Sequence, residues 1–174
     1  MEPSLTVIHA DIKHMEGLLP KLYGDDAVEI PGARDLLRTL GEASIPWAIV
    51  TSGTSPLVTG WLKVLNLPTP EHLVVAEDVV DGKPNPACYL MGKEKLGLHV
   101  GGGEVLVLED APAGIRAGKA AGCKVLGLVT SHTFEQVREA EPDWIVKDLS
   151  SVKVVGIVEG GVELEFSDVL FMKN

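Results

Sequence analysis

The chain has 174 residues, of which 45% are hydrophobic and 23% charged, so it can bury one core and is typical of a single domain. A formal net charge of -10 disfavours nucleic acid or an anionic membrane as the main partner, because both require a basic surface. The two cysteines lack the partners of a zinc site or disulfide framework and no signal-peptide pattern is present, which predicts a soluble, cytoplasmic protein.

Short apolar runs alternate with stretches of helical period along the chain, and this pattern is typical of a mainly parallel sheet covered by helices. The fold class is therefore α/β. In chain order the sequence first predicts a helix over 33–40, a strand over 47–50, a helix opening at Ser55-Pro56, a strand over 73–76 and a helix from Asn85-Pro86 to near Gly97. It then predicts a strand over 105–108, a helix over 113–121, a strand over 125–129, a helix over 133–140 and a strand over 144–146. The last predicted element is a β-hairpin over 152–166 that turns at Gly160-Gly161.

Polar residues follow three of the predicted strands, at the ends where ligands of parallel sheets bind. The first strand ends in Thr-Ser-Gly-Thr at 51–54, immediately before a helix N-terminus that favours an anion. Lys83 stands in a turn that the two following prolines, Pro84 and Pro86, hold rigid. Glu109 and Asp110 directly follow an apolar run, where adjacent carboxylates are costly unless they serve a cation.

Each of these features has a simpler interpretation when taken alone. The hydroxyl-rich turn at 51–54 can be a helix cap, and Lys83 can be a solvated lysine. Together, three successive strand ends converge on one edge of the sheet as an anion cradle, a positive charge and a magnesium site. The combination predicts phosphoryl-transfer chemistry.

The same residues lie in three motifs, VTSGT at 50–54, DGKPNP at 81–86 and VLEDAPAGIRAGKAAGC at 107–123. In order and spacing they resemble the second, third and fourth signature motifs of haloacid dehalogenase (HAD) phosphatases, in particular the fungal glycerol-phosphate and 2-deoxyglucose-6-phosphate phosphatases. The resemblance runs from about Met15 to the C-terminus. It implies a HAD-like Rossmannoid three-layer sandwich and a Mg²⁺-dependent phosphatase of small polyol or sugar phosphates.

The resemblance also assigns roles to six residues. Phosphate binding falls to Thr51, Ser52, Gly53 and Lys83, and the Mg²⁺ ligands are Asp110 and Glu109. Thr51 is expected to hydrogen-bond the transferred phosphoryl group, and Lys83 to neutralise its developing charge. The implied partner is therefore a small phosphorylated metabolite.

The N-terminal segment departs from the family pattern. HAD phosphatases begin with a strand ending in Asp-x-Asp-Gly, which supplies the nucleophile, followed by a helical cap. Here Asp11 follows an apolar run, but Lys13 stands two places later. Residues 1–30 are expected to be a cap remnant or a substitute N-terminal segment, and residues 31–174 the core domain. A shortened cap helix is favoured over a substitute strand, because Met15, Leu18 and Leu22 follow helical spacing.

Three interpretations of function stay open at this point. The chain is a phosphatase whose nucleophile comes from Asp11 or another chain, a non-catalytic phosphate- and metal-binding or protein-interaction protein, or a shortened product of an ordinary phosphatase. In the family the missing strand is central. Two strands would therefore lack a neighbour, which predicts a homodimer covering that face or strand exchange.

Overall fold

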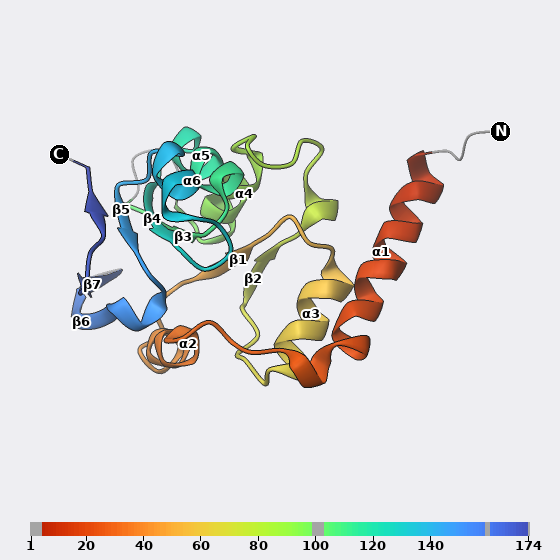
Figure 1. Ribbon diagram of the computed structural model, residues 1–174, viewed down its shortest axis with the longest axis horizontal. Helices are drawn as coiled ribbons and strands as arrows, with labels where there is room; N and C mark the ends of the chain where they lie inside the picture. The colour runs from red at the N-terminus through yellow and green to blue at the C-terminus, as the bar shows by residue number, and fades with distance from the viewer. Residues whose placement is uncertain (1–4, 99–102, 159–160, 174) are drawn as a thin grey trace.

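The computed structural model describes residues 5–98, 103–158 and 161–173. Helices and short strands alternate along the chain, as the sequence predicts (Figure 1). The helices are α1 (Leu5–Leu22), α2 (Ala33–Glu42), α3 (Ser55–Val64), α4 (Ala87–Lys95), α5 (Pro112–Ala120) and α6 (Phe134–Glu139). The strands are β1 (Ala48–Val50), β2 (His72–Val74), β3 (Leu106–Glu109), β4 (Lys124–Leu128), β5 (Trp144–Val146), β6 (Val152–Val158), β7 (Gly161–Phe166) and β8 (Phe171–Met172).

The strands form three separate hydrogen-bonded groups. β1 pairs with β2 in parallel, and β3, β4 and β5 form a parallel sheet whose edge carries β8 in the antiparallel direction. β6 and β7 form the predicted C-terminal hairpin, although Gly160 of its expected turn lies outside the described residues. The α/β fold with a mainly parallel sheet and a C-terminal hairpin is confirmed.

The parallel sheet is interrupted between β1 and β3. Within the described residues no backbone ladder joins these two strands, although Val50 at the end of β1 and Leu108 near the end of β3 line the same pocket. β1 and β3 therefore each keep one edge without a strand partner in this part of the chain, which matches the expectation that a central strand is missing.

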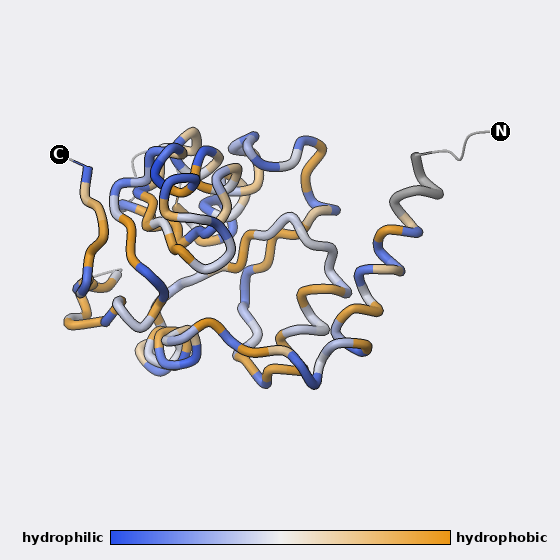
Figure 2. Tube along the Cα trace, viewed as in Figure 1, coloured by the Kyte–Doolittle hydropathy of each residue, from blue (hydrophilic) through white to orange (hydrophobic). Residues whose placement is uncertain are grey.

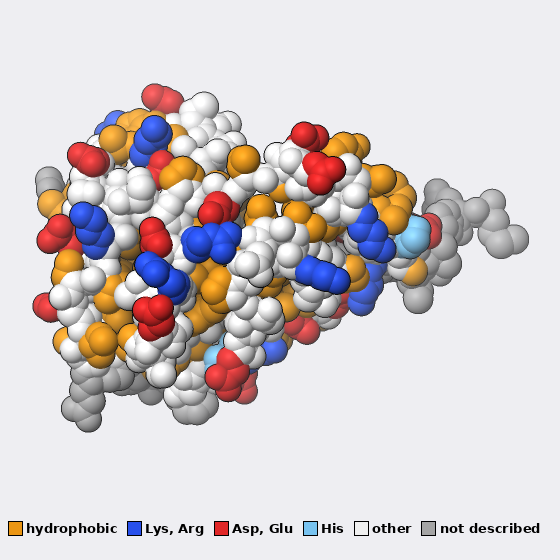
Figure 3. Space-filling model, turned by 90° about the horizontal axis from the view of Figure 1, so that it is seen from below, with side chains coloured by type: hydrophobic (Ala, Val, Ile, Leu, Met, Phe, Trp, Pro, Cys, Tyr) orange, Lys and Arg blue, Asp and Glu red, His pale blue; other side chains and the backbone are white. Residues whose placement is uncertain are grey.

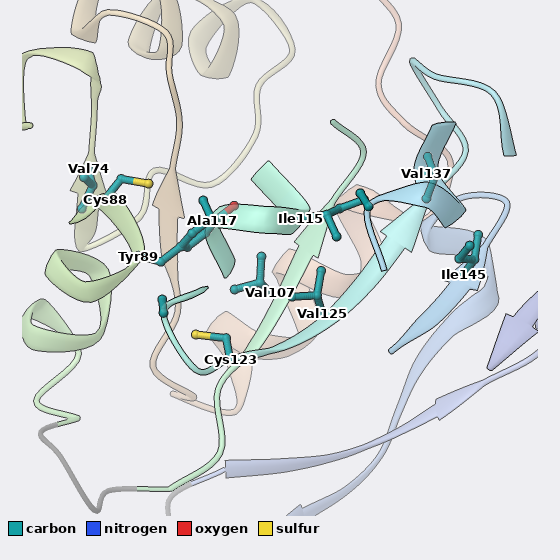
Figure 4. Packing of buried hydrophobic residues seen from close by; sticks show 12 residues of the cluster. Val74, Cys88, Tyr89, Val107, Ile115, Ala117, Cys123, Val125, Val137 and Ile145 are labelled. Atoms are coloured by element: carbon teal, nitrogen blue, oxygen red, sulfur yellow. The ribbon is translucent and has the colours of Figure 1, made fainter. Parts of the chain in front are cut away.

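Alternate residues of the larger sheet face two different layers. Val107, Val125 and Ile145 pack in one core cluster with residues of α4, α5 and α6 (Figure 4). Leu126 and Val146 face the opposite side and pack with α2 and the β6–β7 hairpin. The result is the expected three-layer sandwich. Val74 of β2 belongs to the first cluster, so side chains join the two parts of the sheet where the backbone does not.

The N-terminal segment is helical from Leu5 to Leu22, so the alternative of a substitute strand is wrong for these residues, while residues 1–4 lie outside the described part of the chain. The predicted packing stripe differs, however, since Met15 and Leu22 are exposed. α1 instead packs on α3 through its small or rigid residues: a Cβ added to Gly17 would lie 3.0 Å from Pro56 Cβ, and one added to Gly60 would lie 2.6 Å from Pro20 Cγ. α1 therefore packs on α3 through the face that allows the two helices to approach closely, and not through its apolar stripe.

α3 begins at Ser55, as predicted, with Thr54 as its N-cap residue and Pro56 at the second helical position. The buried residue of α3 is Leu62, whereas Trp61 stays partly exposed. Of the helices that lie in the described residues, none combines the length and hydropathy needed to cross a bilayer.

Candidate functional site

The three predicted strand-end segments converge on one pocket of about 400 Å³. Thr51 and Ser52 enter it from the end of β1, Lys83 from the turn before α4, and Glu109 and Asp110 from the end of β3. Gly53 is the sequence-predicted site residue that does not line it. The carboxyl ends of β1 and β3 thus bring their polar residues together across the interruption in the sheet.

Lys83 is held at the floor of this pocket by three acceptors. Its Nζ donates to the carbonyl oxygen of Val50 and to the hydroxyl of Tyr89, each at 3.1 Å, and forms an ion pair with Glu109. The Lys83 side chain is 10% exposed and that of Glu109 is 8% exposed. A buried ammonium group of this kind requires a paired carboxylate, and Glu109 supplies it.

Glu109 uses both of its oxygens within the protein. Oε1 accepts from Lys83 and, at 2.6 Å, from the Tyr89 hydroxyl, and Oε2 accepts from the Ala111 backbone N–H at 3.1 Å. The carboxylate lies against the first turn of α5, where a Cβ added to Gly114 would come within 2.0 Å of Oε1. A glycine at position 114 is therefore required for Glu109 to reach Lys83.

The hydroxyl of Tyr89 is a buried part of the same network. Burial above all, and then the negative charge of Glu109 and the hydrogen bond to it, raise the pKa of Tyr89 far above its usual range. The phenol consequently stays protonated and keeps donating to Glu109. Since the hydroxyl also accepts from Lys83, it connects the two charged side chains.

Asp110 is arranged differently from its neighbour Glu109. Its Oδ2 accepts a 3.1 Å hydrogen bond from the Thr130 hydroxyl at the end of β4, and the residue lines the pocket. A carboxylate oxygen is the type of ligand that Mg²⁺ prefers, although Mg²⁺ takes about six oxygens. Among the described residues, no group of three or more His, Cys, Asp or Glu side chains is placed to hold a metal. The Asp110 carboxylate is therefore the right type of ligand for Mg²⁺ and would supply one of the oxygens that a bound ion needs.

The turn after β1 is shaped by its own hydrogen bonds. Thr51 Oγ1 accepts from the Gly53 N–H at 3.0 Å, which leaves the hydroxyl hydrogen available to donate into the pocket. At the start of α3 the Thr54 N–H donates to Glu16 at 2.8 Å, and the Ser55 N–H donates to Glu77. These two N–H groups at the helix N-terminus, where an anion is expected, thus bind carboxylates of the protein itself.

Asp11 has no place in the pocket. It is exposed on α1 and is not among the residues that line the pocket. α1 instead reaches this region through Glu16 and through Lys13, whose Nζ lies 3.0 Å from Glu77. The hypothesis that Asp11 supplies the nucleophile is therefore dropped.

Sequence patterns did not single out Tyr89, Gly114 or Thr130 as site residues. Tyr89 lies on the inner face of α4 with apolar neighbours, and its position signals only core packing, although a buried phenol usually has a polar partner. Gly114 follows Glu109 by five residues at the start of a small-residue helix. The contacts of both residues depend on how α4 and α5 sit against β3.

Comparison with known proteins agrees with this architecture. The family model described as haloacid dehalogenase-like hydrolase matches residues 7–122. Glycerol-1-phosphate phosphohydrolase 1 of Saccharomyces cerevisiae is 39% identical over 173 residues, covering 94% of this chain and 68% of that protein. 2-Deoxyglucose-6-phosphate phosphatase 2 of the same yeast is 35% identical over 163 residues, covering 85% of this chain and 66% of that protein.

A solved structure shows the same likeness in three dimensions. The putative beta-phosphoglucomutase from Thermotoga maritima superposes with a TM-score of 0.67 at 27% identity, covering 84% of this chain and 67% of that chain. The chain thus spans about two thirds of the length of each of these relatives. The family expected from the three motifs is confirmed, and the protein belongs to the haloacid dehalogenase-like hydrolases.

Proposed function

We propose that the pocket at the ends of β1 and β3 binds the phosphoryl group of a small polyol or sugar phosphate together with Mg²⁺, in a site of the phosphatase type. The observation that supports it most directly is that Thr51, Lys83 and Asp110 line one pocket. A hydroxyl donor, a fixed positive charge and a carboxylate are the groups that phosphoryl transfer uses.

Each side chain has a distinct role in this proposal. The Thr51 hydroxyl donates to a phosphoryl oxygen, and Ser52, which also lines the pocket, adds a polar contact. Gly53 shapes the turn through its N–H, which donates to Thr51 Oγ1. Lys83, fixed by Val50 and Glu109, offsets the negative charge that develops on the phosphoryl group. Because its acceptors already position it, little reorganisation is needed when the ligand binds.

Asp110 is the residue assigned to hold Mg²⁺, with Thr130 orienting its carboxylate. When bound, Mg²⁺ would neutralise charge on the phosphoryl oxygens. We assign Glu109 the task of anchoring Lys83, with direct metal contact as its second role. The names of the yeast relatives, which act on glycerol phosphate and 2-deoxyglucose 6-phosphate, support the choice of substrate class.

A specific observation supports a second candidate, phosphate and metal binding without turnover. Among the described acidic residues, Glu109 and Asp110 are those that line the pocket, and Glu109 is committed to Lys83. Covalent phosphoryl transfer needs a further carboxylate as nucleophile. Ligand binding requires only the groups already present, so it persists when turnover does not.

The test combines turnover with binding. Phosphate release from glycerol phosphate and 2-deoxyglucose 6-phosphate is measured with Mg²⁺, and binding of the same esters is measured by calorimetry with Mg²⁺ and with EDTA. Asp110→Asn is expected to lose turnover and the Mg²⁺-dependent part of binding. Asp81→Asn, which changes an exposed carboxylate in the turn before Lys83, serves as the matched control.

The outcomes separate the two candidates. Mg²⁺-dependent turnover that Asp110→Asn abolishes and Asp81→Asn leaves intact establishes a phosphatase. Mg²⁺-dependent binding without turnover establishes the binding protein. Binding that is equal in the wild type and Asp110→Asn, with and without EDTA, refutes the proposed metal site.

The cytoplasmic location and the lack of a nucleic-acid partner stay predictions.

A further inference from the structure

The face of α1 that points away from α3 carries a regular apolar stripe. Its members stand three, four and three residues apart: Ile12, Met15, Leu19 and Leu22. This is the a/d spacing of a coiled-coil seam, and in the sequence Leu5 and Ile8 extend the repeat to three heptads. Orange and blue segments alternate along α1 accordingly (Figure 2).

The stripe is exposed, although the helix that carries it is packed. The exposed fractions of its four described side chains are 45%, 62%, 38% and 67% in chain order. α1 lies at one end of the molecule with its other side against α3 (Figure 1), and hydrophobic side chains gather over that end (Figure 3). One face of α1 is thus buried, and the opposite face is left for a partner.

α1 is also fixed in position, so that the stripe is presented on a firm support. The Thr54 N–H donates to Glu16 at 2.8 Å, Lys13 pairs with Glu77 at 3.0 Å, and Pro20 packs on the Gly60 backbone of α3. These contacts use heptad positions b and e, which do not belong to the a/d seam. A partner can therefore dock without displacing them.

The exposed area is sufficient for a specific interface. Together with Tyr23, which is 55% exposed, the stripe presents on the order of 500 Å² of largely apolar surface per chain, a size that marks interaction sites on soluble proteins. Two such faces bury on the order of 1,000 Å², which is the lower limit for specific association. Interfaces at this lower limit are typical of weak, reversible association.

We propose that the occupant of this seam is α1 of a second copy of this chain, packed in the antiparallel direction. In a parallel, in-register pair, Asp11 at position g would face Glu16 at position e of the other copy, and two acidic residues would repel each other. In an antiparallel pair, position g of one copy faces position g of the other, and position e faces position e. Asp11 therefore does not face Glu16. The inference does not depend on the proposed phosphate site.

Light scattering with size-exclusion chromatography tests the dimer at chain concentrations of tens of micromolar. The wild type is expected at twice the chain mass of 18.5 kDa. Met15→Glu and Leu22→Glu, each placing a charge in the seam, are expected to give the single-chain mass with an unchanged circular dichroism spectrum. Val80→Glu, which changes a fully exposed valine outside α1, is expected to stay dimeric.

Other results would overturn the proposal. A wild type at the single-chain mass excludes the dimer. A dimer that persists in both Met15→Glu and Leu22→Glu places the interface elsewhere, for example at the interrupted sheet. Oxidation of a Leu22→Cys variant gives the orientation, since a parallel pair would bring the two new thiols together and become cross-linked. An antiparallel pair keeps them apart, so no cross-linked dimer is expected.

Discussion

The hydroxyl of Tyr89 donates a 2.6 Å hydrogen bond to Oε1 of Glu109 and accepts one of 3.1 Å from Lys83. A core tyrosine on α4 thereby holds the ion pair that forms the floor of the pocket. Since both partners are charged and buried, the hydrogen bonds of this hydroxyl are stronger than those between neutral groups.

Replacing Tyr89 with phenylalanine tests that role. Tyr89→Phe is expected to lower the free energy of unfolding by ~1–3 kcal/mol, because the buried ion pair loses a polar neighbour. Urea unfolding at neutral pH measures the change. Tyr23→Phe, at the exposed tyrosine after α1, is the control and should change stability by under ~0.5 kcal/mol. Equal effects of the two changes would contradict the assignment.

The raised pKa of Tyr89 also predicts a pH dependence. An unfolded tyrosine has a pKa of about 10, and the folded pKa lies above it because of burial and the charge of Glu109. The contribution of Tyr89 to stability is thus complete below pH ~10 and is lost as the pH rises above that value. The difference in unfolding free energy between wild type and Tyr89→Phe is expected to shrink from pH 9 to pH 11. A constant difference would show that the phenol titrates normally.

Gly114→Ala tests how closely Glu109 lies against α5. The added Cβ would fall 2.0 Å from Glu109 Oε1, so the carboxylate must move and the Lys83 pair is disturbed. The expected loss of stability is ~1–3 kcal/mol, together with weaker phosphate-ester binding. Gly41→Ala in α2 is the matched control, since nothing lies within 4 Å of its Cβ. It should stabilise by up to ~1 kcal/mol. The melting temperatures of both variants, compared with that of the wild type, measure these changes in stability.

Asp143 makes stability depend on acid pH. Burial alone would raise its pKa, but hydrogen bonds from Lys119 and from the Val125 N–H outweigh it and lower the pKa of this carboxyl. Its stabilising contribution is therefore complete above pH ~4, the value of an unfolded aspartate, and is lost as the pH falls below that.

Asp143→Asn should accordingly lower the free energy of unfolding by ~1–3 kcal/mol at pH 7, and its difference from the wild type should become smaller below pH ~4. Urea unfolding of both proteins at pH 7, 5 and 3 measures this difference. The exposed carboxylate of Glu141, paired with Lys173 at 3.2 Å, gives the control Glu141→Gln, with an expected effect within ~1 kcal/mol. A gap that stays constant down to pH 3 would contradict the lowered pKa.

The sequence predicts the sheet, its helices and the convergence of the strand ends, because hydrophobic period and strand-end chemistry are local signals. It does not predict which face of α1 is buried: the apolar stripe through Met15 and Leu22 is stronger in the sequence than the close fit of Pro20 on Gly60. It also misses β8, since two residues are too few to show a period. The orientation of Glu109 toward Lys83 is tertiary and has no local sequence signature.

The interruption between β1 and β3 has a consequence for local unfolding. A two-stranded ladder is marginal alone, so the amides of β1 and β2 are expected to exchange hydrogen for deuterium sooner than those of β3, β4 and β5. A phosphate ester that is bound by Thr51 directly and by Asp110 through Mg²⁺ would bridge the two parts and slow exchange in β1. The ligand would then connect the two parts of the sheet and contribute some of the stability that a continuous sheet otherwise provides.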